Sequence, residues 1–175
     1  VLQRAQSGRN RNGIGAMGRA AVDLLLATAN SDSGSVVAEI GRSMTAALNG
    51  GNAVVCIATC TQRHLFEEQM ENRGIDIVGA LMREQLVCLN ALDSLMRIMV
   101  NGVPDVIRFA EVIGASVDRA AVRYPRVLLY GEFASLLSSN HRGAMELDAM
   151  WESFVKSRPV FIQCLKGAAV HQEQF

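Results

Sequence analysis

The sequence predicts an α/β protein, a three-layer sandwich around a mainly parallel five-stranded sheet. Short apolar runs that stop at glycine or polar residues alternate with longer stretches whose apolar residues recur every three or four positions. The clearest run is 127–129, which follows Pro125 and stops at Gly131 and Glu132. Strands that alternate with helices favour a parallel sheet covered by helices on both faces.

The first elements follow a polar segment. Residues 1–20 are rich in arginine, glycine and asparagine and are expected to be a disordered leader, so one domain is predicted over 21–175. The apolar run 22–27 is the first expected strand. A helix is expected over 35–48 because its apolar residues share one face, and the second strand is expected over 53–58.

The middle of the chain continues the alternation. A helix is predicted over 61–73 and stops at Gly74, and a short helix around 77–83 leads to a third strand over 86–89. The next helix is expected over 92–100. Successive strands are therefore separated by helices, as a parallel sheet requires.

The longest predicted helix runs from Pro104 to Tyr124. The preceding pair Asn101-Gly102 is read as the end of one helix, and a proline is tolerated in the first turn of the next. Pro125 ends the long helix and the strand at 127 follows. The predicted buried stripe consists of Val106, Phe109, Ala110, Ile113, Val117, Ala120, Ala121 and Tyr124.

The last elements are a helix that begins over 133–137, an amphipathic helix over 143–156 and a fifth strand over 159–164. Trp151 shares an apolar stripe with Phe154 and is expected in the core rather than in a binding site.

Composition excludes several classes of protein. The net charge is zero and the pI is near 7, so a basic nucleic-acid-binding face is not expected. The apolar runs are far shorter than the ~20 residues of a membrane span, and no signal peptide is visible. The four cysteines fall mostly within or at the ends of predicted strands, which suits a reducing cytosol. A cytoplasmic protein is expected.

Two phosphate-binding motifs are excluded. The segment 13–18 matches G-x-G-x-x-G, but no strand precedes it, so dinucleotide binding is not expected. A P-loop needs a lysine beside its glycines, and the only lysines, Lys156 and Lys166, lie near the C-terminus. No cofactor is predicted.

The candidate site is the crevice at the carboxyl ends of the strands, where open α/β sheets bind their ligands. Thiolate, imidazole and carboxylate side chains there could bind zinc, and a cysteine there could act as a nucleophile with His64 as base. The spacing lacks a CxxC pair and no nucleophile motif is present, so neither metal binding nor catalysis is expected. The predicted ligand-binding residues are Thr59, Cys60, Arg63, His64, Tyr130, Gly131, Glu132 and Cys164.

Glu132 has two interpretations of equal weight. A carboxylate at the end of a buried strand must be solvated, paired or hydrogen-bonded, because an isolated buried charge is costly. It could contact a ligand, or it could be structural and cap a loop or pair with an arginine such as Arg63.

Several segments together resemble the MEDS (methanogen/methylotroph sensory) domain, over roughly residues 22–166. Their order and spacing are more specific than any one of them. The segments are Leu48-Asn49-Gly50-Gly51-Asn52-Ala53-Val54-Val55, Gly74-Ile75-Asp76-Ile77, Tyr130-Gly131-Glu132-Phe133 with Leu136-Leu137, Glu146-Leu147 with Trp151, and Cys164 after an apolar strand.

The resemblance implies a fold similar to the RecA-like ATPase fold of the clock protein KaiC, without its P-loop. It implies a non-catalytic sensory domain of a bacterial signal-transduction protein, a histidine kinase of a two-component system or a transcription regulator. The ligand would be small and possibly hydrocarbon-derived, and the partner would be an output domain of the same protein, with a homodimer possible. Two alternatives are a RecA-like nucleotide-binding ATPase domain and a dimerisation scaffold.

Overall fold

The computed structural model describes residues 33–133, 135–157 and 162–166, and of the last segment only the backbone. Among these residues, four strands form one parallel sheet in the order β2-β1-β5-β6. The α/β class and the parallel sheet are confirmed. The predicted first strand over 22–27, the leader and the glycine-rich segment 13–18 lie outside the described residues. The strands are β1 (Ala53–Ala58), β2 (Leu86–Asn90), β5 (Val127–Gly131) and β6 (Ile162–Lys166).

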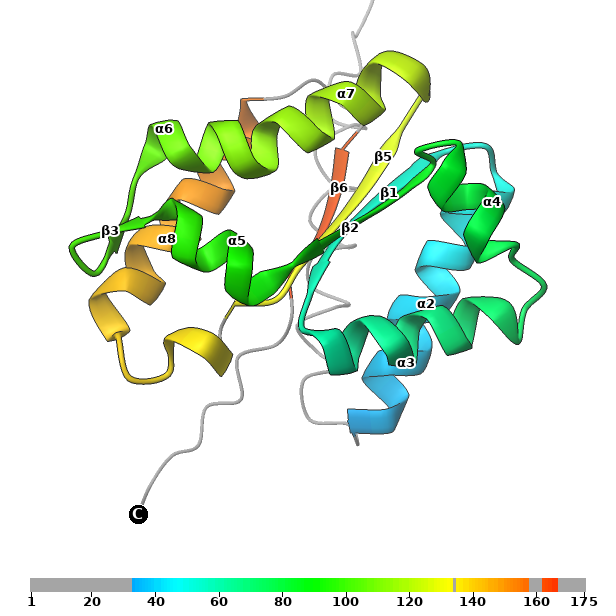
Figure 1. The fold of residues 1–175 in the computed structure, drawn as a ribbon, viewed down its shortest axis with the longest axis horizontal. Helices are drawn as coiled ribbons and strands as arrows, with labels where there is room; N and C mark the ends of the chain where they lie inside the picture. The colour runs from blue at the N-terminus through cyan, green and yellow to red at the C-terminus, as the bar shows by residue number, and fades with distance from the viewer. Residues whose placement is uncertain (1–32, 134, 158–161, 167–175) are drawn as a thin grey trace, which may run out of the picture.

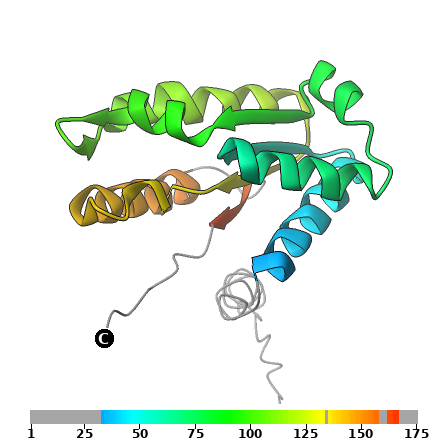
Figure 2. The ribbon, with the colours of Figure 1, turned by 60° about the horizontal axis from the view of Figure 1, so that its bottom comes forward.

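Helices cover both faces of this sheet, which gives the three predicted layers (Figures 1 and 2). One face packs against α2, α3 and α4, and the opposite face packs against α5, the long α6–α7 helix and α8. The helices that flank the sheet are α2 (Ser33–Asn49), α3 (Cys60–Glu71), α4 (Ile77–Met82), α5 (Ala91–Ile98), α6 (Val106–Phe109), α7 (Ala115–Arg123) and α8 (His141–Lys156).

The central strand β1 shows why the apolar runs are continuous. All six of its residues are buried, since both of its faces are covered. Successive side chains alternate between the two hydrophobic clusters: Val54 and Cys56 belong to the cluster under α2–α4, and Val55 and Ile57 to the cluster under α5–α8.

A short hairpin replaces the predicted junction between two helices. α5 ends at Ile98, and the strands β3 (Met99–Val100) and β4 (Val103–Pro104) pair antiparallel. Asn101 and Gly102 have φ angles of 51° and 81°, and two consecutive positive φ values are what a type I′ hairpin turn requires. The interpretation of Asn101-Gly102 as a helix stop was therefore wrong, because Asn-Gly is also a strong hairpin signal.

The long helix begins later and is less regular than predicted. Pro104 pairs with Met99 in the hairpin, and Asp105 caps the helix by accepting a hydrogen bond from the Arg108 N–H at 2.9 Å. The segment η2 (Ala110–Gly114) then forms a π-helical turn between α6 and α7. A π turn inserts one residue into the helical repeat and so rotates the face that is buried. The predicted stripe is therefore wrong in part: after the π turn begins, Ala110 and Ala121 are exposed, whereas Val112 and Ser116 are buried. Val106, in the first turn of the helix, is exposed as well.

The C-terminal elements agree with the predictions apart from their bounds. A single 3-10 turn, η3 (Ser135–Leu137), stands where a helix was expected to begin over 133–137. β6 (Ile162–Lys166) overlaps the predicted strand over 159–164, of which residues 159–161 lie outside the described residues. Trp151 is 3% exposed and packs in the core, as predicted. None of the described helices is long and apolar enough to cross a membrane.

Candidate functional site

The parallel register brings the carboxyl ends of three strands, β2, β1 and β5, to the same end of the sheet. Ala58 pairs with Asn90, and Ile57 pairs with Gly131. The residues that follow, Thr59 after β1 and Glu132 after β5, therefore leave the sheet side by side. The Glu132 N–H still donates to the Ile57 carbonyl oxygen at 3.1 Å, which ties the two chain segments together.

Thr59 begins a helix instead of a loop. Its side-chain oxygen accepts a hydrogen bond from the Gln62 N–H at 3.3 Å, and the Gln62 side chain accepts one from the Thr59 N–H at 3.0 Å. This reciprocal pair is a capping box, which satisfies two amides that the first helical turn leaves without partners. α3 thus begins at Cys60, one residue before the predicted helix start at residue 61.

Cys60, Arg63 and His64 are exposed on the first two turns of α3. Cys60 Sγ accepts a hydrogen bond from Asn90 Nδ2 at 3.3 Å, which links α3 to the end of β2. Arg63 Nε bonds Glu67 Oε1 at 2.7 Å, and this hydrogen bond raises the pKa of the arginine. An exposed pair at i,i+4 contributes only about 0.3–0.5 kcal/mol, so it orients Arg63 more than it stabilises the domain.

Glu132 is 7% exposed, and one of the two structural roles predicted for it is confirmed. Its Oε1 accepts a hydrogen bond from the Ser135 N–H at 3.3 Å, at the start of η3. The carboxylate therefore caps the turn that follows β5.

Tyr130 and Gly131 point to opposite faces of the sheet. The Tyr130 ring packs edge-to-face on Phe66 of α3, with ring centroids 5.1 Å apart. A Cβ built on Gly131 would instead lie 2.7 Å from Trp151 Cζ2 on the other face. The two neighbours thus do not line a common wall. Burial raises the pKa of the Tyr130 hydroxyl, and the nearby Glu132 carboxylate raises it further.

Two cysteines that were not predicted as site residues, Cys56 and Cys88, form a row with Tyr130 across the sheet beneath α3. Cys56 pairs with Cys88 on one side and with Tyr130 on the other, so the three side chains project from the same face. Cross-strand register was the missing information, because residues in three separate strands become neighbours only once the strand order is known. Cys164 occupies the position beside Leu129 in β6, and its side chain lies outside the described part.

The thiols should differ strongly in reactivity. Burial raises the pKa of Cys56 and raises that of Cys88 to about 11, whereas Cys60 is exposed. Because the thiolate is the nucleophile, iodoacetamide at pH 8 should label Cys60 first and Cys88 much more slowly. Labelling of Cys88 should accelerate as the pH rises towards 11, and Cys56 should react only when the domain unfolds. Peptide mass spectrometry over time would measure this order, and rapid labelling of Cys56 in the folded protein would contradict it.

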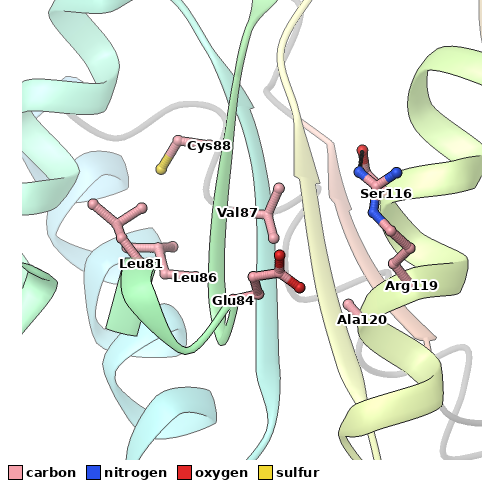
Figure 3. A pocket seen from close by; sticks show the side chains of 8 residues that line it. All are labelled: Leu81, Glu84, Leu86, Val87, Cys88, Ser116, Arg119 and Ala120. Atoms are coloured by element: carbon pink, nitrogen blue, oxygen red, sulfur yellow. Dashed lines mark hydrogen bonds between the residues drawn. The ribbon is translucent and has the colours of Figure 1, made fainter. Parts of the chain in front are cut away.

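A groove of about 230 Å³ lies along the outer edge of β2, away from the strand ends. Figure 3 shows Leu81 and Cys88 on one side of this strand, and Val87 facing Ser116 and Arg119 of α7 on the other. None of the residues that line the groove was predicted as a site residue. They are Leu81, Glu84, Leu86, Val87, Cys88, Ser116, Arg119 and Ala120.

The comparisons with known proteins give one match, to a family model. In the described part of the chain, no group of three or more histidine, cysteine or acidic side chains is placed to hold a metal ion. The searches of curated proteins and of solved structures found no match, so the relation to the RecA-like and KaiC folds stays a prediction. The family model described as "MEthanogen/methylotroph, DcmR Sensory domain" matches residues 31–165, most of the chain. The chain therefore belongs to the MEDS family of sensory domains.

Proposed function

We propose that this sensory domain binds a small, largely apolar molecule at the carboxyl ends of β1 and β5 without transforming it. The observation that carries the proposal is that a buried tyrosine, Tyr130, lies beside a buried carboxylate, Glu132, at the carboxyl ends of the strands. The domain belongs to a sensory family. Ligand sites are typically apolar with a few convergent polar groups. Tyr130 and Glu132 supply those polar groups here.

The surroundings of this pair favour an apolar ligand. Phe66 covers the Tyr130 ring, and Cys56 lies beside it in the sheet. The Tyr130 hydroxyl is protonated at neutral pH, as tyrosines ordinarily are, and can donate a hydrogen bond. Arg63, His64 and Cys60 on the exposed start of α3 would form the entrance rather than the floor.

Glu132 also connects the proposed site to the rest of the domain. It caps η3, and the turn after η3 leads to Asn140, whose side chain accepts a hydrogen bond from the Gly143 N–H and so begins α8. A ligand that competes for the Glu132 carboxylate would loosen η3 and change the packing of α8. Such a change requires two states with different ligand affinity. An output domain of the same protein, in a histidine kinase or transcription regulator, would read it.

A thermal-shift screen tests the proposal. Small chlorinated, aromatic and methylated compounds would be compared with ATP and GTP plus Mg²⁺. A ligand at about 100 times its Kd adds roughly 2.7 kcal/mol to the free energy of unfolding. We expect a shift from at least one apolar compound, weaker in Tyr130→Phe and in Glu132→Gln. Glu71→Gln is the matched control, because Glu71 is exposed on the last turn of α3, away from the strand ends.

Two results would contradict the proposal. A stabilising shift from ATP with Mg²⁺ would favour the RecA-like nucleotide-binding alternative. An apolar compound that stabilises the wild type, Glu132→Gln and Tyr130→Phe equally would bind elsewhere, and the groove along β2 would then be the first place to examine.

A further inference from the structure

Among the described residues, no strand pairs with the outer edge of β2. β2 is the end strand of the sheet in the described part of the chain, and its sequence Leu-Val-Cys-Leu-Asn carries neither charge nor proline. Proteins usually protect an edge with lysine, proline, a bulge or a covering element. Here the groove leaves the edge open between α4 and α7 (Figure 3).

The hydrogen-bonding groups along this edge can be assigned. The Val54 N–H donates to the Gln85 carbonyl oxygen at 2.7 Å, so Gln85, Val87 and Leu89 face β1. In a parallel ladder the alternate residues turn their N–H and C=O groups the other way. Leu86 and Cys88 therefore present backbone donors and acceptors to the groove.

Exposed apolar side chains lie on the two helices that precede and follow β2 in the chain. α4 precedes β2 and exposes Val78 and Met82, and α5 follows β2 and exposes Leu92 and Met96; their exposed fractions are 68%, 82%, 51% and 69%. A stable interface buries about 800 Å² per partner, more than a five-residue strand edge offers. The exposed side chains of α4 and α5 would add apolar surface area to such an interface.

We propose that β2 pairs antiparallel with β2 of a second copy of this chain, across a two-fold axis perpendicular to the sheet. One pair of charges near the edge, Arg119 and Asp93, is complementary in this arrangement, while Glu84 at the groove is already paired with Arg123 of its own chain. Arg119 of α7 lines the groove beside the first half of β2, and Asp93 lies in the first turn of α5, just after β2 ends. α5 and α7 cover the same face of the sheet. Antiparallel pairing brings the start of one β2 to the end of the other, so each Arg119 faces Asp93 of the second copy.

The zero net charge of the chain removes long-range repulsion between two copies. The segment that leads into β2 and the end of α7, which form the two walls of the groove, are also bonded to each other. Arg123 bonds Glu84 at 2.7 Å, and the Tyr124 hydroxyl donates to the Arg83 carbonyl oxygen at 2.8 Å. The edge is thus presented by a fixed frame, which lowers the ordering cost of association.

A charge swap tests the dimer. Light scattering after gel filtration should give the mass of two 18.9 kDa chains for the wild type. Arg119→Glu and Asp93→Lys should each give one chain, because each brings like charges together, and the double variant should restore two chains. Cys88→Pro should also give one chain, since it removes an N–H that faces the groove and leaves the bonds to β1.

Arg42→Glu is the matched control, because this exposed arginine lies on α2, on the opposite face from α5 and α7. It should stay dimeric, and thermal melts would show that every variant is folded. A monomeric wild type overturns the proposal. So does a dimer that survives Arg119→Glu, Asp93→Lys and Cys88→Pro alike. The ligand proposal is unaffected by either result, because its site lies at the strand ends.

Discussion

Replacement of Gly131 by alanine is expected to destabilise the domain by about 3 kcal/mol, the upper end for overpacked cores. A Cβ at this position would lie 2.7 Å from Cζ2 of Trp151, and still closer to Cη2 of the same ring. The indole is 3% exposed and packs against Phe109 and Phe133, so it cannot move aside easily. Urea unfolding followed by circular dichroism would measure the loss.

Coupling between Gly131 and Trp151 identifies the cause. Trp151→Phe removes the ring atoms that approach Gly131, and it destabilises the domain by leaving a cavity. The double variant should therefore lose at least about 1 kcal/mol less than the sum of the two single losses. Gly34→Ala is the matched control: no atom of the described residues lies within 4 Å of a Cβ built there, and alanine in a helix should be neutral or slightly stabilising. Strict additivity of Gly131→Ala and Trp151→Phe would mean that the ring contact is not the reason for glycine.

This pair shows why the Tyr130-Gly131-Glu132 motif could be only partly interpreted from the sequence. The alternation of strand side chains assigns Tyr130 and Gly131 to opposite faces, but it does not say which helix covers each face. Gly131 was grouped with the ligand-binding residues because it lies at the carboxyl end of a predicted strand. In the structure its missing side chain makes room for Trp151, which lies 20 positions later in the sequence.

Local patterns predicted the elements well where one signal acted alone. The buried strands β1 and β5 and the amphipathic helices α2 and α8 follow directly from apolar spacing. Predictions failed where two signals overlapped. Asn101-Gly102 can end a helix or turn a hairpin, and both φ angles there are those of the hairpin.

Contacts between distant segments could not be predicted. The capping role of Glu132 is local, and it was among the alternatives considered. The row formed by Cys88, Cys56 and Tyr130 depends on strand order, which the sequence does not give. The open edge of β2 depends on strand order as well, because the same apolar run in the middle of the sheet would be paired with strands on both sides.

Replacement of Phe109 by alanine should cost about 3–5 kcal/mol, more than any other substitution considered. Phe109 is 2% exposed and stacks edge-to-face on Trp151 and Phe154, with ring centroids 5.7 and 5.4 Å away. It is also the last residue before the π turn, so the buried face of the long helix begins at this side chain.

The neighbouring Ile107→Ala is the matched control, because this side chain is 67% exposed on the same helix. It should change the free energy of unfolding by less than about 0.5 kcal/mol, as surface substitutions usually do. At roughly 2–4 °C per kcal/mol, Phe109→Ala should lower the Tm by about 6–20 °C. If both variants lost similar stability, the long helix would not be buried through the face that begins at Phe109. The position of the π turn, and with it the groove wall that α7 contributes, would then have to be revised.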